Sequence, residues 1–176
     1  RRYIRRKLGV INRLRSQNHE LRRQLKSQRE MLTRLAEEYS QMGDECISTY
    51  GDAASALANY DKALQLDPSS MRALMGKARV LLKTQPAKAL PWAERAVNTG
   101  AELPAILLRG ECQIAVGHLK AAREDAALAL DLDVESAEAH ELMAAVLTRE
   151  GDEDQASIHR AIAEELRKRK DRKRKG

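Results

Sequence analysis

The chain has 176 residues, of which 33% are charged and only 3% are aromatic, with no Phe. Its net charge of +6 is uneven: residues 1–35 hold twelve Lys/Arg against two Glu, residues 167–176 hold eight against one Asp, and residues 36–166 carry −11. No apolar run approaches the roughly 20 residues of a membrane span, and two cysteines without a CxxC pair argue against a secreted disulfide framework.

A seven-residue period runs from Ile4 to Met42 and predicts a coiled-coil helix over residues 1–42. The expected seam residues are Ile4, Ile11, Leu14, Asn18, Leu21, Leu25, Leu32 and Leu35. An apolar stripe of this kind on a helix surface needs a partner helix to cover it. A single Asn18 at an a position favours a parallel two-stranded coiled coil. The first expectation is therefore a homodimer. Pairing with another protein's helix, or packing onto the chain's own array, are the alternatives.

A basic cluster opens the chain and consists of Arg1, Arg2, Arg5, Arg6 and Lys7. Positive residues collect on the cytoplasmic flank of membrane spans and are attracted to anionic lipid. Because the chain starts without Met, we expect an upstream anchor and a cytoplasmic location at the inner face of a membrane. A solvated helix start is the other interpretation.

The heptads stop at Gly43, where we expect the helix either to bend or to enter the next element out of phase. Beyond it, alanines recur at a fixed interval. Ala56, Ala89, Ala122 and Ala156 lie 33, 33 and 34 residues apart, and Ala63, Ala96, Ala129 and Ala163 follow at the same intervals. A period near 34 residues is typical of stacked helix pairs, so residues 43–166 are predicted to form about four of them.

The segments GDAASALANYDKALQLDP, GHLKAAREDAALALDLD and GDEDQASIHRAIAEEL each resemble the second helix of a tetratricopeptide (TPR) repeat. Small residues at Ala78, Gly110 and Ala144 recur in the first helices, where two helices approach closely. The resemblance implies an all-α fold, a right-handed superhelical array preceded by the long coiled-coil helix. It also implies protein binding, although this fold serves many unrelated tasks.

A stacked array of this kind has a concave face lined by the first helix of each repeat. Helical spacing predicts that the partner-binding groove displays Arg72, Met75, Arg79, Lys83, Leu107, Leu108, Glu111, Ile114, Glu141 and Arg149. Apolar residues at the centre with cations to one side suit an extended segment or helix that carries apolar anchors and acidic residues. A face that merely stays soluble is the alternative.

No catalytic residues, metal ligands or cofactor site emerge: the four histidines lack metal spacing, and no phosphate-binding Gly loop or GxSxG is present. The polybasic tail, residues 167–176, is too charged to pack. We therefore expect a non-catalytic interaction scaffold or assembly factor, similar in layout to inner-membrane assembly factors of secretion machines. The alternatives are a subunit recruited through hetero-coiled-coil pairing, and a basic nucleic-acid-associated protein, although nucleic acid is an unlikely partner for a segment without stacking aromatics.

Overall fold

The computed structural model describes the backbone of residues 2–175 and the side chains of residues 7, 9 and 11–174. This part of the chain consists of eight α-helices and contains no strand. The helices are α1 (Arg2–Tyr50), α2 (Ala53–Leu66), α3 (Met71–Leu82), α4 (Pro86–Thr99), α5 (Leu103–Val116), α6 (Leu119–Leu132), α7 (Ala137–Glu150) and α8 (Glu153–Lys175). The predicted all-α class is confirmed.

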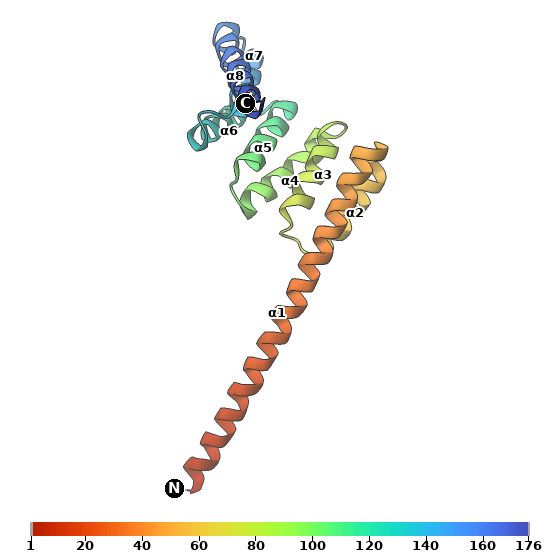
Figure 1. Ribbon diagram of the computed structural model, residues 1–176, viewed down its shortest axis with the longest axis vertical. Helices are drawn as coiled ribbons and strands as arrows, with labels where there is room; N and C mark the ends of the chain where they lie inside the picture. The colour runs from red at the N-terminus through yellow and green to blue at the C-terminus, as the bar shows by residue number, and fades with distance from the viewer. Residues whose placement is uncertain (1, 176) are drawn as a thin grey trace.

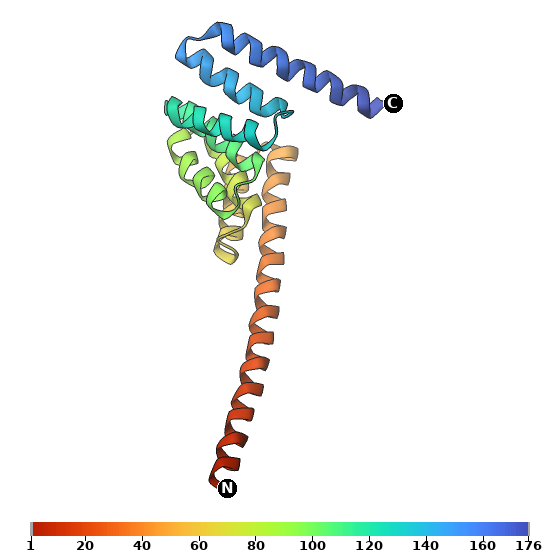
Figure 2. The same cartoon turned by 90° about the vertical axis from the view of Figure 1, so that its left-hand side faces the viewer.

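The helices form four antiparallel pairs that stack into a superhelical array, with α1 projecting from one end (Figures 1 and 2). The alanines of the 34-residue period lie where the helices of a pair meet, and all eight are at most 1% exposed. A methyl side chain lets two helix backbones approach closely. The period therefore marks the packing contacts of the array.

Side chains and glycines at the helix ends explain why the helices begin and stop where they do. Asp52, Ser70 and Ser136 accept hydrogen bonds from backbone N–H groups of α2, α3 and α7. Gly117 and Gly151 end α5 and α7 with φ values of 87°, in the left-handed region that favours glycine. These capping residues act within a few residues of the helix ends, so the boundaries of the helices follow from the local sequence.

Helix α1 is 49 residues long and has no break at Gly43. Figure 1 shows it running straight from the coil segment into the array. Its side chains begin to be buried at Ala36, ahead of the expected boundary at residue 43, and Ser40 and Gly43 continue the buried face. The expected bend is therefore wrong, and α1 enters the array with a changed packing face.

Gly43 instead makes room for Tyr60 of α2, which is only 2% exposed. A Cβ atom added at Gly43, or at Gly76 of α3, would lie 2.5 Å from Cε1 of Tyr60. The ring thus occupies space left by a glycine on each of the two neighbouring first helices. Its hydroxyl donates a hydrogen bond to Oδ1 of Asp44 at 2.7 Å, and Nε of Arg72 donates to Oδ2 of the same carboxylate at 2.8 Å.

Helix α8 continues through the polybasic segment instead of ending at Leu166. Arg167 donates a hydrogen bond to Glu141 at 2.6 Å, and Arg169 forms an ion pair with Glu135 at 3.6 Å. The expectation that this segment does not pack is therefore wrong at its start. Carboxylates of α7 and of the turn before it hold the first residues of the segment in place.

We predict that Gly43→Ala destabilises the array by about 1–3 kcal/mol, because a methyl group there overlaps the Tyr60 ring and forces the core to shift. This cost exceeds the gain in helix propensity of roughly 1 kcal/mol. Chemical denaturation measures the change. Gly9→Ala is the control: nothing lies within 4 Å of its added Cβ, so the array should lose no stability. Equal effects of the two substitutions would contradict the packing described.

Candidate partner-binding groove

A hollow of about 480 Å³ lies beside the C-terminal ends of α1 and α3, where the turns after these helices and α5 complete its walls. Its walls are Ile47, Gly51, Ala53, Arg79, Val80, Leu82, Lys83, Thr84 and Glu111. Ile47, Ala53, Val80 and Leu82 give the interior an apolar character. Two cations and one carboxylate stand among these apolar walls.

The ends of α1 and α3, the turns that follow them and the middle of α5 line this hollow. Arg79 and Lys83 lie at the C-terminal end of α3, and Glu111 reaches it from α5. Ile47 comes from the last turn of α1, and Gly51 turns the chain into α2 with a φ of 65°. A non-glycine residue rarely adopts that backbone conformation, so Gly51 fixes the wall that α1 and α2 share.

The charges of the hollow do not cancel. Arg79 and Lys83 are exposed. Glu111 is exposed as a residue, but the atoms around its carboxylate partly desolvate it and raise its pKa, while the positive charge of Arg79 opposes the rise. A segment that brings a carboxylate toward Arg79 and Lys83 would therefore meet two cations with only one nearby anion.

The structure brings Arg79, Lys83 and Glu111 together, as the sequence predicted. Met75, Leu107 and Ile114 lie half-buried on α3 and α5, and Arg149 is exposed on α7, away from the hollow. Two predicted residues are engaged within the chain: Arg72 pairs with Glu37 and Asp44 of α1, and Glu141 pairs with Arg167 of α8.

Leu108 was wrongly assigned to the groove. It is 2% exposed and packs with Ala78, Leu81, Ala93 and Cys112 between the second and third repeats. Leu107 and Leu108 are consecutive, so their side chains point about 100° apart around the helix, and only one of them can face the groove.

Sequence reasoning missed Ile47, Gly51, Ala53, Val80 and Thr84. Ile47 and the turn after it belong to the first repeat, which was predicted to begin at residue 43, but groove residues were chosen only from the second, third and fourth repeats. Extending the same helical spacing to residues 43–50 would have found Ile47.

The described seam residues of α1 are all exposed. The exposed fraction ranges from 39% at Leu35 to 64% at Leu25. The coil segment does not fold back on its own array (Figures 1 and 2), which removes that alternative for the single chain. The predictions for Ile4, Arg1, Arg2, Arg5 and Arg6 lie outside the described side chains. Lys7 is described and exposed.

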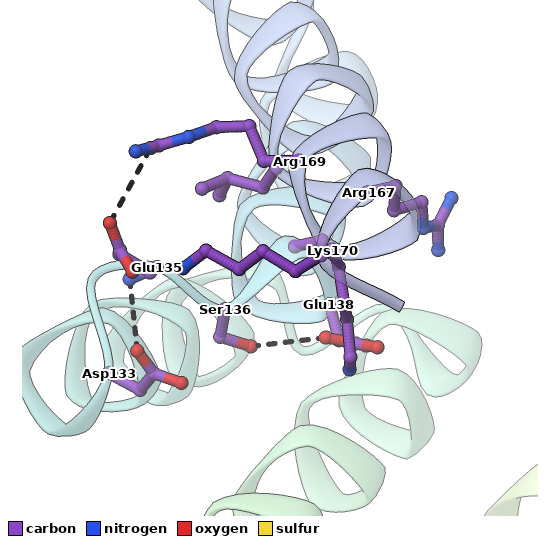
Figure 3. Close-up of a pocket in the computed structure, with 10 residues that line it drawn as sticks. Asp133, Glu135, Ser136, Glu138, Arg167, Arg169 and Lys170 are labelled. Carbon is purple, nitrogen blue, oxygen red and sulfur yellow. Dashed lines mark hydrogen bonds and ion pairs between the residues drawn. The ribbon is translucent and has the colours of Figure 1, made fainter. Parts of the chain in front are cut away.

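A second hollow, of about 290 Å³, lies where the basic end of α8 crosses the turn between α6 and α7 (Figure 3). Arg167, Arg169 and Lys170 approach it from α8, and Asp133, Glu135 and Glu138 approach from the opposite side. The ion pair of Arg169 with Glu135 already crosses this hollow, so we interpret it as a contact within the chain.

His140 and His159 are in contact, which nothing in their sequence positions predicted. Their Nδ1 atoms lie 2.9 Å apart, and Nε2 of His140 lies 3.1 Å from the carbonyl oxygen of Val134. This pair links α8 to α7. Among the described side chains, no group of three or more His, Cys, Asp or Glu residues is arranged to hold a metal ion. None of the described helices is both long and apolar enough to cross a membrane.

Comparison with known proteins gives a consistent result for the fold. No protein-family model matches the chain, and no match was found among curated proteins. Among solved structures, MamA from Desulfovibrio magneticus RS-1, residues 41 to the end, is 31% identical, with 77% of each chain covered and a TM-score of 0.67. YrrB, a TPR protein with an unusual peptide-binding site, is 28% identical over 73% of this chain and 66% of its own, with a TM-score of 0.60. A thermophilic TPR protein from Thermus thermophilus is 22% identical over 74% of each chain, with a TM-score of 0.67.

We predict that Glu111→Gln stabilises the chain increasingly as the pH rises from 4 to 7. A carboxyl with a raised pKa in the folded state costs stability as it ionises, because the unfolded chain releases the proton more readily. The neutral amide avoids this cost. Thermal unfolding at several pH values measures it. The control is Glu124→Gln on α6, a carboxylate that does not line the hollow. A difference from the parent chain that stays constant with pH would contradict the desolvation of Glu111.

Proposed function

Because the chain belongs to the tetratricopeptide repeat family, we propose that it is a non-catalytic protein-interaction scaffold whose concave groove holds a segment of a partner protein. In this proposal residues 43–166 are the main part of the binding array, and residues 167–176 are a basic extension. Residues 1–42 are the coil that joins the array to a second helix, and its last turns, from Ala36, already pack against the array. The hollow between the first three repeats is the observation that carries the proposal.

The hollow supports a partner of definite chemistry. Ile47, Val80 and Leu82 would surround an apolar side chain and remove it from water, which is favourable in proportion to the apolar area buried. Arg79 and Lys83 beside them would attract a carboxylate of the same segment. An apolar anchor followed by an acidic residue therefore fits better than a basic or wholly polar segment.

The relatives support the same class of function. YrrB has a peptide-binding site on the same fold and is 28% identical. Peptide binding in that protein is consistent with peptide binding in the groove of this chain. The residues that line the hollow then determine which kind of peptide fits.

We further propose that the coil segment forms a parallel homodimer. Leu14, Leu21 and Leu25 expose a continuous apolar stripe, and Asn18 at an a position selects two strands in register. A dimer would present two grooves joined by one rigid helix pair, so that a partner carrying two binding segments would be held more tightly than either segment alone.

The location is also a proposal. The cluster of Arg1, Arg2, Arg5, Arg6 and Lys7 would lie against anionic lipid at the cytoplasmic face of a membrane. A basic segment at a membrane followed by a repeat array would suit a subunit of an assembly or secretion complex at an inner membrane. If the cluster contacts lipid in this way, binding of the chain to anionic vesicles should depend on these five residues.

The groove is tested with four-residue blocked peptides of three kinds: apolar with acidic, apolar with basic, and acidic without apolar residues. Nuclear magnetic resonance should show the methyl signals of Ile47 and Leu82 shifting only with the first kind, with affinities in the millimolar range. Arg79→Ser with Lys83→Ser should weaken binding about tenfold, since each of the two exposed ionic contacts contributes about 0.7 kcal/mol.

The matched control is Lys88→Ser with Lys120→Ser, two exposed lysines on second helices that face away from the groove. This variant loses the same charge and should bind as the parent does. Equal weakening by both variants would mean that net charge, and not the hollow, governs binding. Equal shifts with all three peptides would rule out the groove chemistry.

The homodimer is tested by light scattering on the full chain and on Leu21→Asp with Leu25→Asp. Two buried charges in the seam should convert a dimer of about twice the 19.8 kDa chain mass into a monomer. Ser16→Asp with Ser27→Asp adds the same charge outside the seam and should stay dimeric. A parent chain that is monomeric at all concentrations would refute the homodimer.

A further inference from the structure

One row of α1 beside the apolar seam carries an arginine at every seventh residue: Arg15, Arg22 and Arg29. Successive members lie about 10 Å apart along the helix, so all three face the same side. Their side chains are exposed and form no ion pair or hydrogen bond within the described chain. Each is a cation beside a surface that needs a partner helix.

The arginine row and the seam border the same hollow on α1. Ile11, Leu14 and Asn18 line an open hollow of about 450 Å³, and Arg15 and Arg22 form part of its wall. In a coiled coil, a side chain of the facing helix inserts into a hole of this kind, and the flanking e and g positions choose the partner by charge. The residue that enters this hollow therefore belongs to a helix whose flanks lie against arginine.

A second copy of this chain supplies no opposite charge at those places. In a parallel homodimer, Arg22 faces Gln17 and Arg29 faces Gln24 of the other copy, so no carboxylate meets the row. Residues 7–35 also hold eight Lys/Arg against two Glu, and two such segments side by side repel each other. The seam permits self-pairing, while the flanking charges weaken it.

We propose that the preferred partner of the coil segment is an acidic amphipathic helix of a different protein, with apolar heptad rows and Glu or Asp on the flank that faces Arg15, Arg22 and Arg29. This inference rests on the proposed role of the coil in association and is independent of the groove. The acidic helix displaces the second copy and converts a homodimer into a one-to-one pair. The chain then joins two different partners, one through α1 and one through the array.

The 176-residue chain is titrated with a labelled 28-residue designed helix that has Leu and Ile in its heptad rows and Glu at both flanks. Two companion peptides carry Gln or Lys at the flanks. The acidic peptide should bind roughly tenfold more tightly than the Gln peptide, which is three exposed ion pairs of modest strength. The advantage should shrink as salt rises, because exposed charges are screened. The Lys peptide should bind weakest.

Two matched triple variants test whether the arginine row causes the preference for the acidic peptide. Arg15→Glu, Arg22→Glu and Arg29→Glu together should reverse the order, so that the Lys peptide binds best. Arg13→Glu, Arg23→Glu and Arg34→Glu make the same change in net charge on other faces of α1 and should keep the acidic peptide first. Loss of the preference in both variants, or equal binding of the acidic and Gln peptides, overturns the proposal.

The outcomes separate this inference from the proposed homodimer. A chain that dimerises and does not prefer the acidic peptide refutes the hetero-partner alone. A chain that neither dimerises nor binds any of the three peptides refutes the association role of the coil, and this inference with it. Neither result bears on peptide binding in the groove.

Discussion

The ring of Tyr60 is the contact on which the geometry of the molecule depends. It lies between the first helices of repeats one and two, in space that Gly43 and Gly76 leave free, and its hydroxyl is bound by Asp44. Arg72 reaches the same carboxylate from α3. Burial and the Asp44 bond both raise the pKa of Tyr60, so it stays a neutral donor. One side chain thereby fixes how α1 is held against the array.

The packing of Tyr60 against α1 has consequences in both directions along this helix. Toward the C-terminus it sets Ile47 beside Val80 and Leu82 and so shapes the hollow that we propose binds a partner. Toward the N-terminus it aims the exposed seam and the arginine row away from the array (Figure 2). Because one unbroken helix carries both surfaces, the distance and direction between the two proposed partners are fixed by packing and not by a flexible linker.

The sequence predicted the fold well because its signals are local and repeated. Alanines such as Ala56 and Ala63 recur at a fixed interval, and caps such as Asp52 define helix ends without distant contacts. Of the two outcomes expected at Gly43, the bend is wrong, since a helix glycine indicates a bend unless the ring that fills its place, Tyr60, is known. It misplaced Leu108 because helical spacing gives a face only to within about 100°, whereas packing between repeats decides which neighbour faces solvent. It could not show that Arg72 and Glu141 are engaged within the chain, because their partners are distant in sequence.

The central claim, that the concave side of the array is where a partner binds, is tested most directly by site-specific photo-crosslinking in the organism's own extract. A benzoylphenylalanine replacing Lys83, at the rim of the hollow, is compared with one replacing Lys88, which is exposed on α4. The account predicts one discrete adduct from position 83 that an acidic apolar peptide suppresses, and none from position 88. Adducts from position 88 alone, or adducts at both positions that the peptide does not suppress, would contradict it.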